Sequence, residues 1–140
     1  MLPEYWGKYG WGFFHMVAKD YPENPTDEDK EHYRDYYTSI QYVLPCSKCR
    51  LNYKNHLKKL PITDEVLSNR QNLIHWTIDV HNIVNHYTGK PMLTYSEGME
   101  EIDKLSNPEK NIFSNGASYL LLIILLVILG FIIYYYVKNK

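Results

Sequence analysis

The sequence predicts an all-α protein: four longer helices and a short fifth helix, followed by a helix that crosses a membrane. Three observations lead to this fold class. No segment shows the strict apolar and polar alternation that is typical of a half-buried strand. Apolar residues instead recur every three or four positions within residues 1–105, which is the spacing of amphipathic helices. The stretch 117–137 contains no charged residue, as expected of a membrane span.

A segment with two prolines separates the first two expected helices. We expect the first helix over residues 3–20, with an apolar stripe formed by Trp6, Tyr9, Phe13, Val17 and Tyr21. Pro22 and Pro25 end this helix, because proline lacks a backbone N–H and disfavours helix in the preceding residue. Thr26 then has the side chain of a helix N-cap, and acidic residues follow it. The second helix is therefore expected over residues 27–43.

Capping residues place the third and fourth helices. The third helix is expected from near Cys46 to about residue 59. Ser68 and Gln71 have the spacing of a capping box, which predicts a fourth helix over residues 69–87. Gly89 is expected to end this helix, because glycine readily adopts the left-handed conformation found at helix C-termini.

The short fifth helix is expected over residues 95–105. Thr94 and Glu97 again have capping-box spacing. Met99 and Ile102 are its inward-facing residues, because they lie three positions apart on one face.

Composition divides the chain into a folded domain, a linker and an anchor. We expect the domain over residues 1–105, a polar linker over 106–116, a transmembrane helix over 117–137 and a short basic tail over 138–140. A helix of about 20 apolar residues spans a bilayer core. A core helix is the alternative, but so small a domain could hardly surround a helix that is apolar on all faces. Tyrosines at both ends fit an interfacial belt: Tyr119, Tyr134, Tyr135 and Tyr136.

Charge and tyrosine content restrict the classes of partner. The formal net charge is −1, so no basic field predicts a nucleic-acid partner. The 14 tyrosines suit a protein that stacks on a flat ligand, although most are better explained as covering partly exposed helix faces.

Lysines are almost balanced on the two sides of the span, so the orientation of the span in the membrane stays open. Because only three residues follow the span, we expect insertion after synthesis, with the domain in the cytosol.

Cys46 and Cys49 are the only cysteines in the chain. A Cys-x-x-Cys pair can close a disulfide or hold one edge of a metal site. At the start of a helix, the positive end of the dipole favours the thiolate form. Lys48 and Arg50 add local positive charge. These effects suit thiol–disulfide exchange.

Two polar and aromatic clusters flank this pair in the sequence. On the fourth helix, His81, Asn82 and Asn85 lie close to one face and are followed by Lys90. An imidazole and two carboxamides can hydrogen-bond a heteroaromatic edge, and a lysine can reach a phosphate. Taken singly, each is better explained as a capping, solvated or core residue. Together with the cysteine pair, they indicate a ligand site.

The second cluster combines glycines with aromatic rings near the N-terminus. Gly7, Gly10 and Gly12 lie beside Trp11 and His15. Each glycine costs up to about 1 kcal/mol in a helix relative to alanine, so three of them suggest close approach by a flat ligand or another backbone. The alternative is a frayed helix start with Trp11 as a core anchor.

Zinc binding is the principal alternative. Cys46, Cys49, His81 and His86 have suitable chemistry, and the spacing of the two histidines lies in the usual range. However, the cysteine and histidine pairs are much farther apart than the roughly 12–15 residues of common zinc fingers. Zinc also leaves the N-terminal cluster unexplained. A membrane-tethered scaffold without a cofactor is a further alternative.

Four motifs occur in order along residues 4–105: Gly7-Lys8-x-x-Trp11-x-x-x-His15, Tyr21-Pro22, Pro45-Cys46-x-x-Cys49 and His81-Asn82-x-Val84-Asn85-x-x-x-Gly89-Lys90-Pro91. Together they resemble the motifs of the Erv/ALR family of FAD-linked sulfhydryl oxidases. The few cysteines and the membrane anchor are similar to compact members encoded by large DNA viruses, which makes a virion membrane a second expected location.

The resemblance implies a four-helix bundle with a short fifth helix, holding FAD noncovalently in a homodimer. The implied flavin contacts are Gly7, Lys8, Trp11, His15, Cys49, His81, Asn82, Val84, Asn85 and Lys90. Tyr95 is added as a residue near the adenine. Lys8 stands where the family often has arginine, and a lysine lacks the planar fork of a guanidinium.

The resemblance also implies different roles for the two cysteines. Cys46 would receive the substrate thiol in a mixed disulfide, and Cys49 would pass two electrons to FAD. Reduced FAD would then reduce oxygen to hydrogen peroxide. Many members carry a second, shuttling cysteine pair, which this chain lacks. We therefore expect a partner protein, such as a thioredoxin-like carrier, to bring its thiols directly to Cys46.

Overall fold

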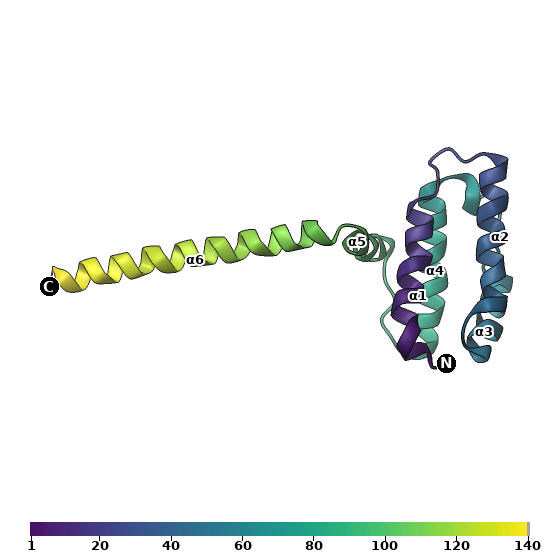
Figure 1. Cartoon of the computed structure of the whole chain (residues 1–140), viewed down its shortest axis with the longest axis horizontal. Helices are drawn as coiled ribbons and strands as arrows, with labels where there is room; N and C mark the ends of the chain where they lie inside the picture. The colour runs from purple at the N-terminus through teal and green to yellow at the C-terminus, as the bar shows by residue number, and fades with distance from the viewer. Residues whose placement is uncertain (140) are drawn as a thin grey trace. The chain divides into compact units, whose positions relative to one another are not determined.

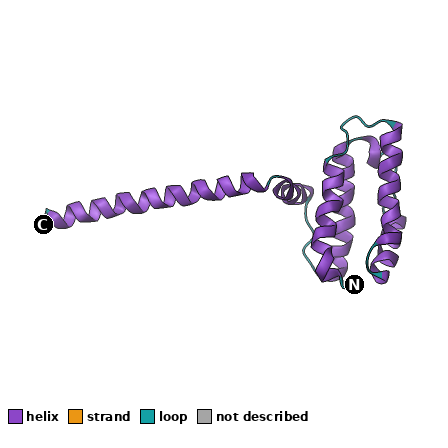
Figure 2. Cartoon of the chain, in the orientation of Figure 1, coloured by secondary structure: helices purple, strands orange, loops and turns teal. Residues whose placement is uncertain are grey.

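The computed structural model describes residues 1–139, with side chains described outside 108–118. Helices account for all regular structure in this part of the chain (Figure 2). The helices are α1 (Pro3–Lys19), α2 (Asp27–Val43), α3 (Ser47–Lys59), the short 3₁₀ helix η1 (Val66–Ser68), α4 (Arg70–Thr88), α5 (Tyr95–Ser106) and α6 (Pro108–Lys138). The all-α prediction is therefore confirmed.

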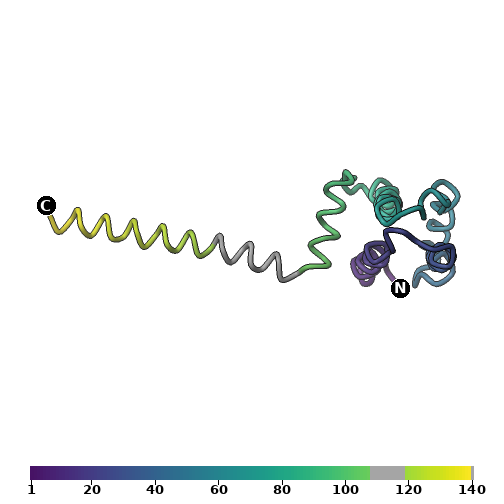
Figure 3. Tube along the Cα trace, turned by 90° about the horizontal axis from the view of Figure 1, so that it is seen from above, coloured from purple at the N-terminus to yellow at the C-terminus, as the bar shows by residue number. Residues whose placement is uncertain are grey.

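The first four α-helices form an antiparallel bundle (Figure 1). Helix α1 packs on α4, and α2 packs on α3. Figure 3 views the bundle along its helices, with the four chain segments around one centre. Because the direction alternates from helix to helix, the start of α1, the start of α3 and the end of α4 lie at the same end of the bundle.

Aromatic side chains fill the centre of the bundle. The Phe14 ring lies edge-on to the rings of Tyr37 at 4.9 Å and Tyr53 at 6.2 Å between centroids. It also stacks with Trp76 at 6.0 Å. One phenylalanine on α1 thereby contacts rings from α2, α3 and α4, so it joins all four helices of the bundle.

Three core tyrosines direct their hydroxyls at backbone carbonyls. The hydroxyl of Tyr37 donates to Phe14 O at 3.0 Å, that of Tyr53 to Tyr37 O at 2.9 Å, and that of Tyr21 to Leu67 O at 2.8 Å. Burial raises the pKa of Tyr37 and of Tyr53, so both remain phenols. A buried hydroxyl is costly without a partner, and these bonds let tyrosine serve as a core residue.

The inward face of α1 differs from the predicted stripe. Tyr9 and Phe13, expected inside, are 76% and 65% exposed. Phe14, His15 and Ala18 are buried instead. Val17 and Tyr21, also in the predicted stripe, do pack against or within the core. The stripe was therefore wrong at Tyr9 and Phe13, where apolar residues on both sides of the helix obscured the true core face.

Most predicted helix ends are confirmed. Thr26 caps α2 through Asp29 N at 3.1 Å, and the Asp29 carboxylate accepts from Thr26 N at 2.8 Å. Thr94 and Glu97 form the same reciprocal pair. Gly89 ends α4 with φ of 68°.

The predicted N-cap of α4 was wrong by one residue. Asn69 caps the helix, because its side-chain oxygen accepts from Asn72 N at 2.9 Å. Ser68 belongs to η1, and its hydroxyl donates to Glu65 O at 2.8 Å. The preceding 3₁₀ turn uses the serine that would otherwise have capped α4.

Helix α5 packs closely on α4 at a glycine. A Cβ atom on Gly98 would lie 2.8 Å from the Ile78 side chain. Ile102 is buried and Met99 packs against the core, as predicted. The Asn82 carboxamide bonds both backbone groups of Leu93, at 2.8 and 2.9 Å, and so holds the segment that leads into α5.

The chain divides into two compact units, Met1–Asp103 and Lys104–Lys140. The second contains α6, whose backbone is helical from Pro108, although a linker was expected over 106–116. Proline is well tolerated at a first helical position. Within α6, the 20 residues Tyr119–Lys138 have a mean hydropathy of 2.9 and none of this stretch is buried. This helix is long and apolar enough to cross a membrane.

Removing the central ring should destabilise the bundle strongly. Phe14→Ala is expected to lower the free energy of unfolding by about 3–5 kcal/mol, because it removes a buried ring and leaves a cavity. Tyr42→Ala is the matched control, since that ring is 71% exposed. Chemical unfolding of both variants, followed by circular dichroism, makes the comparison. Equal losses in the two variants would contradict the central position of Phe14.

Candidate active site

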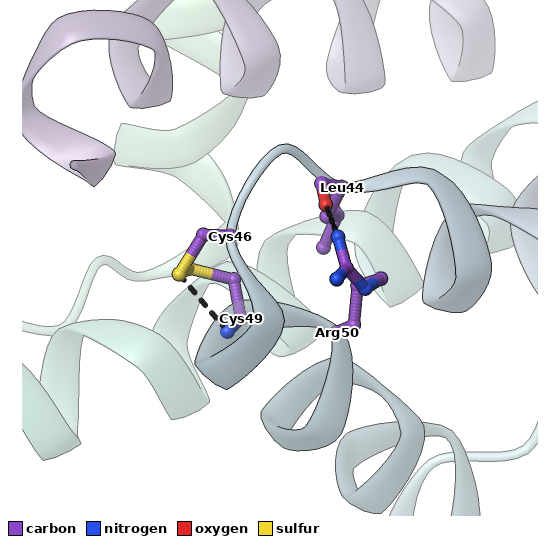
Figure 4. Close-up of a disulfide and its surroundings, with 4 residues drawn as sticks. All are labelled: Leu44, Cys46, Cys49 and Arg50. Atoms are coloured by element: carbon purple, nitrogen blue, oxygen red, sulfur yellow. Dashed lines mark hydrogen bonds between the residues drawn. A yellow bond between two sulfur atoms is a disulfide. The ribbon is translucent and has the colours of Figure 1, made fainter. Parts of the chain in front are cut away.

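The two cysteines form a disulfide at the start of α3 (Figure 4). Cys46 is the N-cap, with extended backbone at φ −147°, and its sulfur accepts from Cys49 N at 3.2 Å. The Arg50 guanidinium donates to Leu44 O and so braces the turn before the disulfide. Both cysteines are half-buried. The geometry presents a sulfur–sulfur bond at a helix N-terminus, where a leaving thiolate is favoured.

The zinc alternative is not supported by this arrangement. The sulfurs of Cys46 and Cys49 are bonded to each other. Across the described residues, no group of three or more histidine, cysteine or acidic side chains could hold a metal ion. The structure therefore does not bring His81 and His86 to the cysteine pair as metal ligands.

The N-terminal cluster and the fourth-helix cluster meet across α1 and α4. The Trp11 ring stacks on the His81 ring at 3.9 Å between centroids, with 8° between the planes. The His15 ring lies 5.8 Å from Trp11 and 5.2 Å from His81. Three residues singled out in the sequence thus form one ring cluster.

The two histidines of this ring cluster are hydrogen-bonded to each other. His15 Nε2 lies 3.0 Å from His81 Nδ1, and His15 Nδ1 lies 2.9 Å from Thr77 Oγ1. Burial and the neighbouring His81 lower the pKa of His15 to about 3. Burial and the Lys90 charge lower the pKa of His81 to about 4. Both rings are therefore neutral at physiological pH.

Thr77 is a site residue that the sequence reasoning missed. Its side chain is fully buried and it contacts His15 directly. The signal was its position four residues before His81, which places both side chains on one face of α4. Thr77 was not considered, because a lone threonine on an apolar helix face carries no motif of its own.

The carboxamides predicted at the site have different surroundings. Asn82 is engaged with Leu93, as described above, which leaves one N–H for another partner. Asn85 is buried, and no hydrogen bond among the described residues uses its carboxamide. The backbone carbonyl of Asn85, by contrast, accepts from Lys90 N at 2.9 Å. Asn85 thus offers unused hydrogen-bonding groups near the end of α4.

The remaining predicted contacts are spread around the bundle. Gly7, Lys8 and Lys90 are on the surface or half-buried, and Val84 is half-buried on the same α4 face as His81. Tyr95 is not joined to the ring cluster. Its ring stacks on His75 at 4.0 Å and its hydroxyl donates to Asp79 at 3.0 Å. His75 and Asp79 occupy a different face of α4 from His81.

Two buried polar atoms have no hydrogen-bond partner in the part of the chain that the structure describes. They are Trp6 Nε1 and His56 Nδ1. His56 lies seven residues after Cys49 on α3, so both side chains occupy one helix face. An unmet buried donor or acceptor costs about 1–3 kcal/mol, and each therefore favours a ligand that supplies the missing partner.

Comparison with known proteins gives a consistent result. A family model described as Erv1 / Alr family matches residues 8–104. A protein named probable FAD-linked sulfhydryl oxidase, from Acanthamoeba polyphaga mimivirus, is 61% identical over 110 residues, which cover 79% of this chain and 77% of that protein. An FAD-linked sulfhydryl oxidase of African swine fever virus is 30% identical over 99 residues, covering 66% of this chain and 76% of the relative.

The fold has a solved counterpart as well. The FAD binding domain of Erv1 from Saccharomyces cerevisiae superposes with a TM-score of 0.67 at 25% identity, over 74% of this chain and 96% of that domain. Residues 8–104, which the family model matches, contain both the disulfide and the ring cluster. The bundle, the ordered motifs and the family match lead to one conclusion: this chain belongs to the Erv1 / Alr family.

Proposed function

We propose that this chain is an FAD-linked sulfhydryl oxidase that forms disulfide bonds in other proteins. The observation that carries the proposal is the Cys46–Cys49 disulfide at the N-cap of α3. The same bundle holds the aromatic and imidazole cluster of Trp11, His15 and His81, in which His15 is buried and the other two rings are half-buried. Viral relatives named sulfhydryl oxidases support the assignment.

The described side chains fit a flavin. The ring cluster offers flat aromatic surfaces and neutral imidazoles, which suit a heteroaromatic ligand. Asn85 and the partnerless nitrogens of Trp6 and His56 offer hydrogen bonds that no described residue satisfies. Trp11, His15, His81 and Asn85 would therefore hold the cofactor. When bound, FAD supplies a two-electron acceptor for a dithiol.

The chain's own sulfurs carry the thiol exchange. A substrate thiolate attacks Cys46, the Cys46–Cys49 bond breaks, and a mixed disulfide with the substrate forms at Cys46. The Cys49 thiolate that leaves lies in the first turn of α3, where the helix dipole stabilises it. The second substrate thiol then attacks the substrate sulfur of the mixed disulfide, and the Cys46 thiolate leaves. This closes the substrate disulfide and leaves both cysteines reduced. Two electrons have moved from substrate to the pair, and oxygen is the proposed final acceptor.

The full chain, purified in detergent, should be yellow and should consume oxygen when dithiothreitol is added. Absorption spectra, flavin content after denaturation and metal content test this directly. A colourless protein that contains one zinc ion per chain would refute the proposal and favour the zinc-binding alternative.

We also infer that α6 anchors the protein in a membrane, with the catalytic domain in the cytosol or on a virion. The 20-residue apolar stretch supports the anchor. Replacing Leu125 with arginine should weaken membrane retention, because a charge at the centre of a span costs about 2.5–3.5 kcal/mol. Leu51→Arg is the control, since that leucine is exposed on α3. Flotation with vesicles measures retention, and equal behaviour of both variants would argue against the anchor.

A homodimer is the proposed assembly. Tyr5, Tyr9 and Phe13 form an exposed aromatic row on α1 at four-residue spacing, and such a patch is typical of an association surface. Tyr9→Glu should shift the protein from dimer to monomer in light scattering at fixed detergent. An unchanged mass would exclude this row as the interface.

A further inference from the structure

The ring cluster contains a directed chain of hydrogen bonds that begins inside α4. Thr77 Oγ1 lies 2.7 Å from Ile74 O, His15 Nδ1 lies 2.9 Å from Thr77 Oγ1, and His15 Nε2 lies 3.0 Å from His81 Nδ1. The chain therefore connects a backbone carbonyl to a histidine through one hydroxyl and one imidazole. We refer to it as the Thr77 relay.

The direction of the relay follows from its first member. A carbonyl oxygen cannot donate, so the single hydroxyl proton of Thr77 is used by Ile74 O. His15 Nδ1 must then carry the proton and donate to Thr77 Oγ1. A neutral imidazole has only one N–H, so His15 Nε2 accepts, and His81 Nδ1 donates to it.

The protonation of His81, at the far end of the relay, follows from this direction. Because neutral His81 carries its proton on Nδ1, its Nε2 presents a lone pair. No hydrogen bond among the described residues uses this nitrogen, and the Trp11 ring stacked at 3.9 Å holds the plane of the imidazole. Burial keeps both histidines neutral, as their lowered pKa values show.

We propose that Thr77 is a positioning residue that sets the tautomers of His15 and His81, so that His81 Nε2 accepts a hydrogen bond from the bound cofactor. This inference rests on the proposed flavin function. It restricts the cofactor group at His81 to a donor, such as a ribityl hydroxyl, a ring N–H or an amino group. A phosphate or carbonyl oxygen is excluded there, because two acceptors face each other unfavourably.

The tautomers can be measured in the unaltered protein. Full-length chain labelled with ¹⁵N-histidine in detergent should show, by long-range ¹H–¹⁵N correlation, that His15 and His81 are both protonated on Nδ1. Assignment uses the single variants His15→Gln and His81→Gln. If either histidine carries its proton on Nε2 in the flavin-free chain, the relay is overturned, whatever the cofactor is.

Two matched substitutions test the role of the hydroxyl. Thr77→Val keeps the shape but removes the acceptor for His15, so the proton should move to Nε2 in both rings. His81 then presents N–H where the cofactor also donates, and flavin affinity should fall about tenfold. Thr77→Ser retains the hydroxyl and should preserve both the tautomers and the affinity.

The outcomes separate this inference from the proposed function. Unchanged histidine shifts in Thr77→Val, or equal losses of affinity in the valine and serine variants, would overturn the positioning role. Wild-type chain that shows the expected tautomers but binds no flavin would leave the relay in place and contradict only the assignment of the ligand.

Discussion

Replacing Cys49 with serine is expected to abolish thiol-dependent oxygen consumption while the flavin stays bound. The variant cannot form the disulfide that accepts electrons from the substrate, and a lone Cys46 can only exchange with one thiol at a time. A loss of at least about three orders of magnitude in turnover is typical when one member of a catalytic unit is removed. Oxygen uptake and the flavin absorption spectrum, recorded on the same sample, test both parts.

Two further variants sharpen this test. Ser47→Ala changes an exposed residue between the cysteines and should keep wild-type turnover. Cys46→Ser should be equally inactive, but only Cys49→Ser retains the sulfur that we assign to the substrate. Cys49→Ser should therefore capture the partner in a mixed disulfide that reductant releases, and a thioredoxin-like carrier is the expected partner. Retained turnover in Cys49→Ser would refute the assigned role.

Acid should destabilise the bundle well before its carboxylates are protonated. Unfolded histidines take up a proton near pH 6.5, whereas His15 and His81 in the folded bundle resist protonation until pH values of about 3 and about 4. Between these limits the unfolded state binds more protons. The contribution of the two histidines to the free energy of unfolding is therefore fully present above pH 6.5 and is lost as the pH decreases. Each histidine contributes up to about 1.4 kcal/mol per pH unit. Together they should remove on the order of 3 kcal/mol between pH 6.5 and 5.

Urea unfolding of the full chain in detergent at several pH values measures this slope. Burial also lowers the pKa of His56, which acts in the same direction. His81→Gln should reduce the slope substantially, because glutamine does not titrate. His86→Gln, at an exposed position on the same helix, is the control and should leave it unchanged. A stability that does not vary from pH 7 to 5 would contradict the buried neutral pair.

Local signals in the sequence were sufficient for most helix boundaries. Thr26 and Gly89 act through their own side chain or backbone conformation, so their neighbours in the sequence identify them. The error at Ser68 has a different origin. Ser68 and Asn69 are both good caps, and the choice between them depends on η1, a turn of only three residues that has no periodicity to detect.

Contacts between helices could not be predicted in the same way. Tyr9 and Phe13 are aromatic side chains of the same kind as those in the core. Only the packing of α1 on α4 shows that Phe14 and Ala18 face inward. The sequence identified Trp11, His15 and His81 as separate clusters, but their stacking across two helices is a tertiary property. Thr77 was missed because its role exists only opposite His15, 62 residues away.

The disulfide at the start of α3 encloses one of the shortest loops that a protein can close, with a sequence separation of 3. In the chain-entropy model, so small a loop restricts the unfolded chain by only about 2 kcal/mol, compared with about 4.7 kcal/mol for a loop of 100 residues. Opening the bond therefore removes little conformational constraint. The aromatic core, rather than the disulfide, keeps the bundle folded, so Cys46 and Cys49 can be oxidised and reduced repeatedly in a protein whose architecture stays the same.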